Sequence, residues 1–322
     1  MTAKRTKIKY QPNAGEKHSA LSALMTALTL ALTLILALFL SEEISLSVKN
    51  SLMLCASVIV PSVFPFIVLS DFLYCFSDFA SLRTLGDIFE RIFKINRAGL
   101  YPFVLGILCG FPLGVKCASE LYSDGRITRD ECERLIGFCN NTGPAFLVCG
   151  IGLGLRGNIH DGIALYLATV FSAVLTGVLF SIQKNASHLE LQKYERPHFS
   201  ITRSVKNAGI GSLYICSYIT FFSCVAGIIK ALFGEGPVFL MTVPFLEVGC
   251  ATEILSKTEL LSDAVSLSAS AFAVGFSGFS VHLQALSFIS ESDVKADRYF
   301  AMKLIQGIIA AATVFITYNL YR

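Results

Sequence analysis

Apolar residues in this chain come in long runs that contain no Asp, Glu, Lys or Arg. The clearest runs cover residues 21–40, 135–155, 162–182, 208–229, 264–290 and 304–320. Each is near or above the length of a helix that crosses about 30 Å of hydrocarbon. A further apolar segment, roughly residues 47–75, carries Pro61 and Pro65, which we expect to kink a helix. The pattern predicts an all-α, polytopic membrane protein with about seven transmembrane helices.

Two of these runs have helix breakers and polar residues at their centres. Residues 137–146 read "GFCNNTGPAF", and residues 275–284 read "GFSGFSVHLQ". Glycine tolerates unwound backbone, and Pro144 suits the first position of a second half-helix. A helix that is broken inside the membrane exposes amide hydrogens and carbonyl oxygens, which can hold a ligand without an ionised side chain. We therefore predict that both spans are discontinuous.

Two shorter apolar segments are predicted to be re-entrant hairpins. Residues 98–122 contain "GFPLG" at positions 110–114, and a plain crossing there would place the basic residues that follow it outside the membrane. Residues 236–257 begin with 11 uncharged residues before Glu247 and Gly249, which is short for a span. Non-helical backbone is tolerated at this depth where it is buried in protein or lines a watery cavity. A plain span is the alternative for each segment.

Basic residues gather before residue 21, in residues 83–97 and in residues 184–206. By the positive-inside rule all three clusters are cytoplasmic, so we expect a cytoplasmic N-terminus. Tyrosines such as Tyr101 and Tyr299 are expected as anchors at the membrane interface.

The chain then divides into four parts, and two of them contain the same kinds of predicted element. Residues 1–97 hold the N-terminus and two spans, and residues 183–206 form a cytoplasmic loop. Residues 98–182 and 207–322 each contain a hairpin and a broken helix, and an offset of 135 positions pairs two glycines in each half, Gly114 with Gly249 and Gly143 with Gly278. The topology places the halves in opposite orientation, which is the inverted repeat of a secondary transporter.

Composition and charge narrow the class of protein. The chain has 322 residues, of which 54% are hydrophobic and 15% are charged, and this is outside the range of soluble domains. The net charge of +3 comes from residues between spans, so we expect no nucleic-acid partner. Ten cysteines without a Cys-x-x-Cys pair indicate neither a zinc site nor a disulfide framework. With no metal cluster, nucleophile motif or phosphate loop in the sequence, we expect no enzyme and no cofactor beyond a coupling proton or cation.

The candidate binding residues lie at the two breaks and the two hairpins. Amides and hydroxyls supply donors and acceptors, Glu247 is an intramembrane carboxylate, and His282 could carry a proton. Each has a packing alternative, in which the asparagines bond to neighbouring helices, the small residues let helices approach, and Lys116 pairs with Glu120. The candidate substrate-binding residues are Gly110, Gly114, Lys116, Asn140, Asn141, Thr142, Gly143, Glu247, Gly249, Ser277, Gly278, Ser280, His282 and Gln284.

The stretches "GFPLGVKCASELYSDGRITRDECERLIGFCNNTGPAFL" and "GFSGFSVHLQALSFIS" resemble the YlbJ-like sporulation integral membrane proteins, within the wider nucleoside-recognition or gate-domain group. The resemblance covers about residues 98–156 and 240–310. It implies a protein of endospore-forming bacteria that helps to move dipicolinic acid across the outer forespore membrane. The gate-domain group is similar to concentrative nucleoside transporters in having two re-entrant hairpins and two unwound helices. Val248 departs from that plan, which has Thr or Ser there, and this weakens any transfer of nucleoside or sodium contacts.

We therefore expect a multi-pass protein of the cell membrane that carries a small, anionic metabolite such as dipicolinic acid. The hairpins would act as gates around a central site, with a small-molecule substrate and the lipid bilayer as partners. A nucleoside-type carrier is one alternative, and a non-transporting scaffold or regulator of a sporulation complex is another. The sequence leaves open the coupling ion, the direction of flow, partner subunits and any homo-oligomer.

Overall fold

The computed structural model describes residues 31, 35, 38–76, 83–182, 199–290 and 292–321. The chain forms two compact units, Met1–Leu46 and Ser47–Arg322. The predicted span at residues 21–40 and most of the predicted loop at residues 183–206 lie outside the described residues. Each regular element in the described ranges is a helix, which confirms the all-α prediction.

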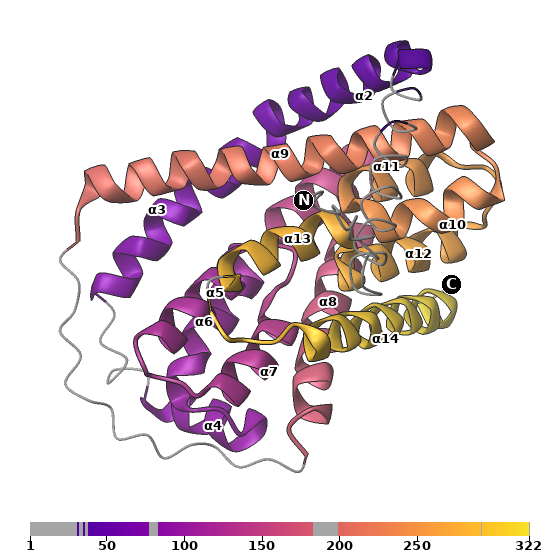
Figure 1. The fold of residues 1–322 in the computed structure, drawn as a ribbon. Helices are drawn as coiled ribbons and strands as arrows, with labels where there is room; N and C mark the ends of the chain where they lie inside the picture. The colour runs from indigo at the N-terminus through magenta and orange to yellow at the C-terminus, as the bar shows by residue number, and fades with distance from the viewer. Residues whose placement is uncertain are drawn as a thin grey trace, which may run out of the picture. The chain divides into compact units, whose positions relative to one another are not determined.

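The elements follow one another along the chain as Figure 1 shows. Helix α2 covers Ser41–Leu54, and the second unit then contains, in order, η1 (Cys55–Ile59), α3 (Val60–Phe76), α4 (Arg83–Phe93), η3 (Arg97–Gly99), α5 (Leu100–Leu108), α6 (Leu113–Ser123), α7 (Arg129–Cys139), η4 (Ala145–Leu155), α8 (Ile159–Leu179), α9 (Ile201–Phe233), α10 (Pro237–Leu246), α11 (Val248–Lys257), α12 (Asp263–Phe276), α13 (Gly278–Ile289) and α14 (Asp297–Tyr321).

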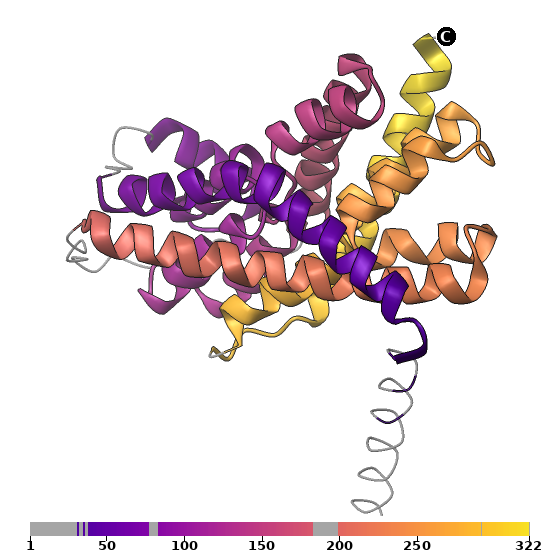
Figure 2. The ribbon, with the colours of Figure 1, turned by 90° about the horizontal axis from the view of Figure 1, so that it is seen from above.

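Four stretches of the described chain are long and apolar enough to cross a membrane. They are Ile159–Leu179, Ile201–Phe233, Asp263–Ile289 and Asp297–Leu320, and they match the last four predicted spans. The longest of them, α9, packs against α3 (Figure 2). Together with the shorter apolar helices, these spans confirm a polytopic membrane protein.

Both predicted breaks are present, and they differ in form. After α7 ends, residues 140–143 are not helical, and the chain becomes helical again at Pro144, as its fixed geometry suggests. The second break is a single turn between α12 and α13, where Ser277 and Gly278 take φ values of 77° and 64°. Gly275, the first residue of the second motif, lies within α12 and is not unwound. A Cβ on Gly275 would lie 2.8 Å from Gly307 Cα, so this glycine lets α12 approach α14 closely.

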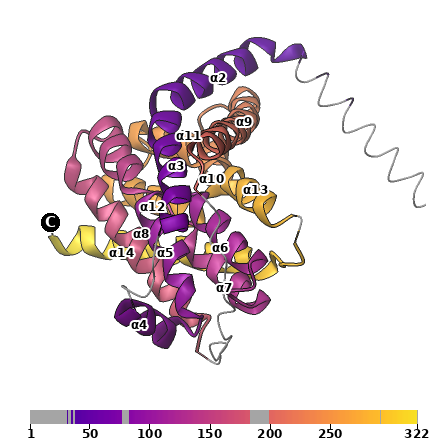
Figure 3. The same ribbon diagram turned by 90° about the vertical axis from the view of Figure 1, so that its left-hand side faces the viewer.

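Both predicted hairpins consist of two short helices joined by a tight turn. Helices α5 and α6 pack against each other (Figure 3), and so do α10 and α11. A helix of about ten residues is about 15 Å long, too short to cross the membrane alone. The first turn contains Gly110 with a φ of 89°, and the second is the extended residue Glu247. Gly114 and Gly249 do not form the turns, because they lie in the first turns of α6 and α11.

The order of elements repeats between the halves. Helices α6 and α11 begin at Leu113 and Val248, which are 135 positions apart, and each is followed by a broken helix and then a long helix, α8 or α14. This agrees with the offset that pairs glycines in the sequence. The opposite orientation of the halves in a bilayer stays a prediction.

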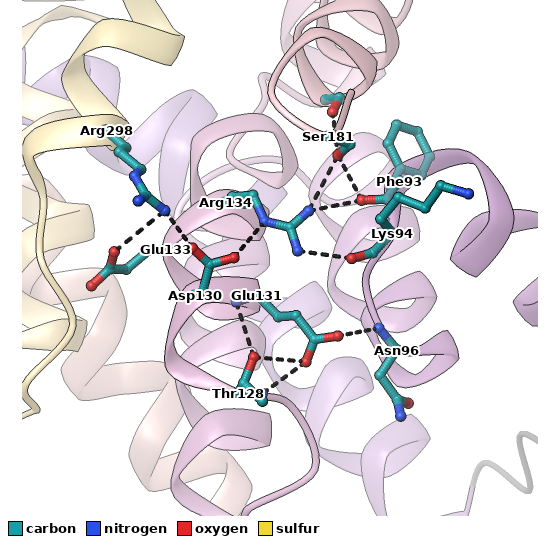
Figure 4. Close-up of polar contacts among 11 residues, drawn as sticks. Phe93, Lys94, Asn96, Thr128, Asp130, Glu131, Glu133, Arg134, Ser181 and Arg298 are labelled. Atoms are coloured by element: carbon teal, nitrogen blue, oxygen red, sulfur yellow. Dashed lines mark hydrogen bonds and ion pairs between the residues drawn. The ribbon is translucent and has the colours of Figure 1, made fainter. Parts of the chain in front are cut away.

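A capping box starts α7. The Thr128 amide donates to Glu131 Oε2 at 2.8 Å, while the Thr128 hydroxyl accepts from the Glu131 amide. The other carboxylate oxygen, Oε1, accepts from the Asn96 amide at 2.8 Å. These contacts, drawn in Figure 4, fasten the start of α7 to the segment before α5.

A buried arginine completes the anchoring of α7. Arg134 is 1% exposed, and its guanidinium donates to the carbonyl oxygens of Phe93 at 2.9 Å and Lys94 at 2.8 Å, at the end of α4. Its Nε donates to Asp130 Oδ2 at 3.0 Å. A cation at the carbonyl end of a helix is favourable. Because α7 is held at this end (Figure 4), its other end, at the first break, has a fixed position.

Candidate functional site

One narrow cavity lies between the first break and the tips of both hairpins. This central cavity has a volume of about 70 Å³, enough for a few water molecules. Most of its wall is apolar. The predicted binding residues that line it are Gly110 of the first hairpin, Thr142 and Gly143 of the first break, Glu247 and Gly249 of the second hairpin, and Gln284 of α13.

Each hairpin tip packs directly against the break of its own half. A Cβ on Gly110 would lie 2.9 Å from the Gly143 nitrogen, and one on Gly278 would lie 3.1 Å from the Leu246 oxygen. Both contacts are closer than side chains ordinarily allow, so glycine is needed at both positions. The tips therefore cover the backbone that the breaks free.

Two polar atoms of the cavity wall have no hydrogen-bond partner among the described residues. They are the Thr142 hydroxyl and the Gln284 side-chain oxygen, and both side chains are 2% exposed. The Gln284 nitrogen donates to Ser280 Oγ at 3.3 Å. A buried polar group without a partner costs about 1–3 kcal/mol, which a bound ligand could recover.

Glu247 is the charged side chain of the cavity wall, and its own helix holds it. Its carboxylate accepts from the amides of Gly249 at 2.9 Å and Cys250 at 2.6 Å, so it caps α11. A carboxylate at a helix start is favourable because the exposed amides and the helix dipole are positive there. The start of α11 thus already holds one carboxylate.

Several candidate residues face α14 instead of the central cavity. Asn140 donates to the Tyr299 hydroxyl at 2.9 Å, and His282 Nδ1 lies 3.1 Å from the same hydroxyl. Ser277 Oγ donates to a carbonyl of its own helix. These contacts agree with the packing alternative for Asn140. Tyr299 is also buried, so the prediction that it anchors the interface is wrong, and the same holds for Tyr101.

The residues that sequence reasoning missed lie on α14. Lys303 is fully buried, and its Nζ donates to the Asn140 carbonyl oxygen at 2.7 Å and to Gln306 Oε1 at 2.8 Å. Gln306 in turn donates to Asn141 Oδ1 at 2.7 Å. Lys303 comes one position before the uncharged run at residues 304–320, so it looks like an ordinary flanking charge.

Lys116 lies outside the central cavity, in an ion pair. Its Nζ is 2.6 Å from Asp71 Oδ1 on α3 and 3.3 Å from Glu120 Oε1. Pairing with Glu120 is the packing alternative, and Asp71 is an unforeseen second partner. Gly114 does not line the central cavity either. A Cβ there would lie 2.1 Å from the Cys139 oxygen, so this glycine lets α6 approach the end of α7.

Two larger cavities flank the central one. A cavity of about 390 Å³, on the side of Lys116, shares Ile215 and Gln284 with it. A cavity of about 560 Å³, beside α10 and α11, shares Leu54 and Glu247 with it. The three cavities therefore form a series, and the narrow central one lies between the two wide ones.

Comparison with known proteins gives one informative match. No protein-family model matches the chain, and no solved structure matches it significantly. The chain is similar to the sporulation integral membrane protein YlbJ of Bacillus subtilis (strain 168), with 26% identity over 84% of this chain and 76% of that protein. The match extends well beyond the two motif stretches. The chain is therefore a relative of the YlbJ-like sporulation integral membrane proteins, as its motifs indicated.

Proposed function

We propose that this protein is a membrane carrier, and not an enzyme, for a small, anionic metabolite. The observation that carries the proposal is the central cavity, which is lined by both hairpin tips and has two buried polar atoms in its wall without partners among the described residues. Wide cavities on both of its sides give a substrate two routes to it. The central cavity must widen to admit a metabolite, and the hairpins would act as gates.

Dipicolinic acid is the first substrate to test. The relative is a sporulation protein by name, which supports a role in sporulation for this chain as well. The rings of Phe111 and Phe146 on the cavity wall suit a flat aromatic molecule, and the Thr142 hydroxyl can donate to a carboxylate. On this proposal the protein acts in the outer forespore membrane, with its N-terminus in the cytoplasm.

Uptake of radiolabelled dipicolinate into proteoliposomes tests the proposal. We expect uptake by the wild type, and a loss of about tenfold or more for Thr142→Val, because it removes a hydrogen bond that the hydroxyl can donate to a charged substrate. Thr176→Val is the matched control, since the Thr176 hydroxyl is also buried without a partner but does not line the central cavity.

The outcomes separate the functions under consideration. If well-folded wild-type protein moves neither dipicolinate nor a panel of other metabolites that includes nucleosides, the carrier proposal is wrong and a scaffold or regulator is favoured. If nucleosides alone are transported, a nucleoside-type carrier replaces the anion carrier. If Thr176→Val loses as much uptake as Thr142→Val, the central cavity is not the site.

A further inference from the structure

Lys303 is a buried lysine that has no anionic partner among the described residues. Its side chain is 0% exposed, and no carboxylate in the described ranges lies within ion-pair distance of its Nζ. By comparison, the buried guanidinium of Arg134 on α7 has the Asp130 carboxylate at 3.0 Å. Both acceptors of Lys303 are neutral oxygens.

Such an arrangement is costly for an ammonium group. Burial of an ion without a counter-charge is strongly unfavourable even after the protein has relaxed. The Asn140 oxygen lies at the end of α7, where the helix dipole contributes a partial negative charge of roughly one half, and this offsets only part of that cost. An ionisable group at this depth is a functional candidate, because a neutral residue would be cheaper there.

The surroundings of Lys303 contain few groups that could share its proton. Cys139 of α7 and His282 of α13 are near enough to interact with it electrostatically. Tyr299 lies one turn earlier on α14 and bonds to His282 and Asn140. The buried faces of α8 and α12, which also pack against α14, carry only apolar and hydroxyl side chains.

Lys303 is connected to the central cavity through the first break. It holds the Asn140 oxygen directly, and through Gln306 it holds the Asn141 side chain. The next two residues, Thr142 and Gly143, are part of the cavity wall. A change in the charge of Lys303 therefore acts on the backbone that shapes the cavity.

A positive charge near the cavity would favour an anionic substrate. Glu247 contributes a carboxyl group to the wall, and in its ionised form this group repels an anion unless a positive charge offsets it. A protonated Lys303 supplies that charge. By linkage, an anion that binds better when Lys303 is protonated must in turn favour protonation of Lys303.

We propose that Lys303 is the coupling-proton site, so that one proton binds at its Nζ together with each anionic substrate. This inference rests on the proposed carrier function. The proton comes from water on the side where the substrate binds, adds to the lone pair of the neutral amine, and returns to water where the substrate leaves. No other bond forms or breaks, and the pair crosses with less net charge than the anion alone.

Simultaneous measurement of substrate and protons tests the inference. Proteoliposomes that contain a pH-sensitive dye are given radiolabelled dipicolinate, with protein-free liposomes as the background. We expect one additional proton to enter for each substrate molecule with the wild type. The matched control is Lys206→Met, at an exposed lysine on α9 that lines none of the three cavities, and it should keep the wild-type ratio.

Variants of Lys303 assign the proton to this residue. Lys303→Arg keeps a permanent positive charge, so it should still exchange external for internal dipicolinate but lose accumulation driven by a pH gradient. Lys303→Met should lose both activities. If neither variant folds, Gln306→Met keeps the lysine and removes one of its acceptors, and half-maximal uptake should move to lower pH by about 0.5–1 unit.

Each contrary result overturns a defined part of the inference. Uptake by the wild type without proton movement leaves the carrier intact and removes the coupling. Coupling that survives in Lys303→Arg, or that is lost only in His282→Gln, removes Lys303 as the site, and so does an unchanged pH profile in Gln306→Met. If the wild type takes up no substrate, the proposed function fails and the coupling fails with it.

Discussion

Replacement of Thr142 by valine should stabilise the empty protein and weaken its binding of substrate. Valine has nearly the shape of threonine but lacks the hydroxyl, and in this protein that hydroxyl is buried without a partner. In most buried positions the same change would be destabilising, because it would break a hydrogen bond. On the proposed carrier function the hydroxyl gains a partner only when substrate binds, so the opposite sign is expected here.

The size of the effect follows from the cost of a buried polar group. An unsatisfied hydroxyl costs about 1–3 kcal/mol. At about 2 °C per kcal/mol for a long chain, Thr142→Val should raise the Tm of the empty protein by about 2–6 °C. Loss of a hydrogen bond to a charged ligand, about 1.5–3 kcal/mol, should raise the Kd for substrate about 10- to 100-fold.

Thermal unfolding in detergent, with and without dipicolinate, measures both quantities on one sample. Thr176→Val should give a similar rise in Tm with an unchanged Kd, because the Thr176 hydroxyl is equally buried but lies away from the central cavity. A fall in Tm for both variants would refute the reasoning, since it would mean that the hydroxyls have partners in the empty protein. A rise in Tm for Thr142→Val with an unchanged Kd would exclude this hydroxyl from the site.

Three further predictions concern the scaffold. Gly278→Ala should lower the free energy of unfolding by about 1–3 kcal/mol more than Gly125→Ala does, because both glycines have a positive φ but only Gly278 packs against a hairpin tip. Equal decreases in the two variants would contradict the tip contact. Arg134→Met should lower the free energy of unfolding by about 1–3 kcal/mol, and with it the Tm and the yield of folded protein, because it removes hydrogen-bond donors from the carbonyl end of α4. An unchanged Tm would show that α7 needs no such anchor. The Tyr122 hydroxyl holds the pKa of Asp293 below its ordinary value, so this contact stabilises the protein above about pH 4 and is lost as the pH falls through the lowered pKa. The Tm difference between the wild type and Asp293→Asn should therefore shrink between about pH 6 and pH 3, and a constant difference would refute the assignment.

The parts of the fold that the sequence predicts well are those encoded locally. Thr128 and Glu131 start a helix by contacts within four residues, and Pro144 restarts one because its ring fixes φ. The two breaks and two hairpins follow from short clusters of glycine, proline and polar residues. Such features depend on the backbone preferences of neighbouring residues, which a single sequence contains.

The parts that could not be predicted depend on packing between distant segments. Lys303 and Gln306 are polar positions at the edge of an apolar run, and only the approach of α7 makes them buried partners of the first break. Gly275 was assigned to a break but serves helix packing, because Gly307 lies opposite it. His282 has the residue type of a site but faces Tyr299 on α14. Each of these roles depends on where α14 packs, and no local sequence pattern predicts that.

The contact of each hairpin tip with the break of its own half links mechanical opening to hydration. Gly110 covers Gly143, and the second tip covers Gly278, so a hairpin that swings outward must wet the peptide groups beneath it. On the proposed carrier function, with the halves in opposite orientation, displacement of one hairpin would admit water from one compartment while the other hairpin keeps its own break covered.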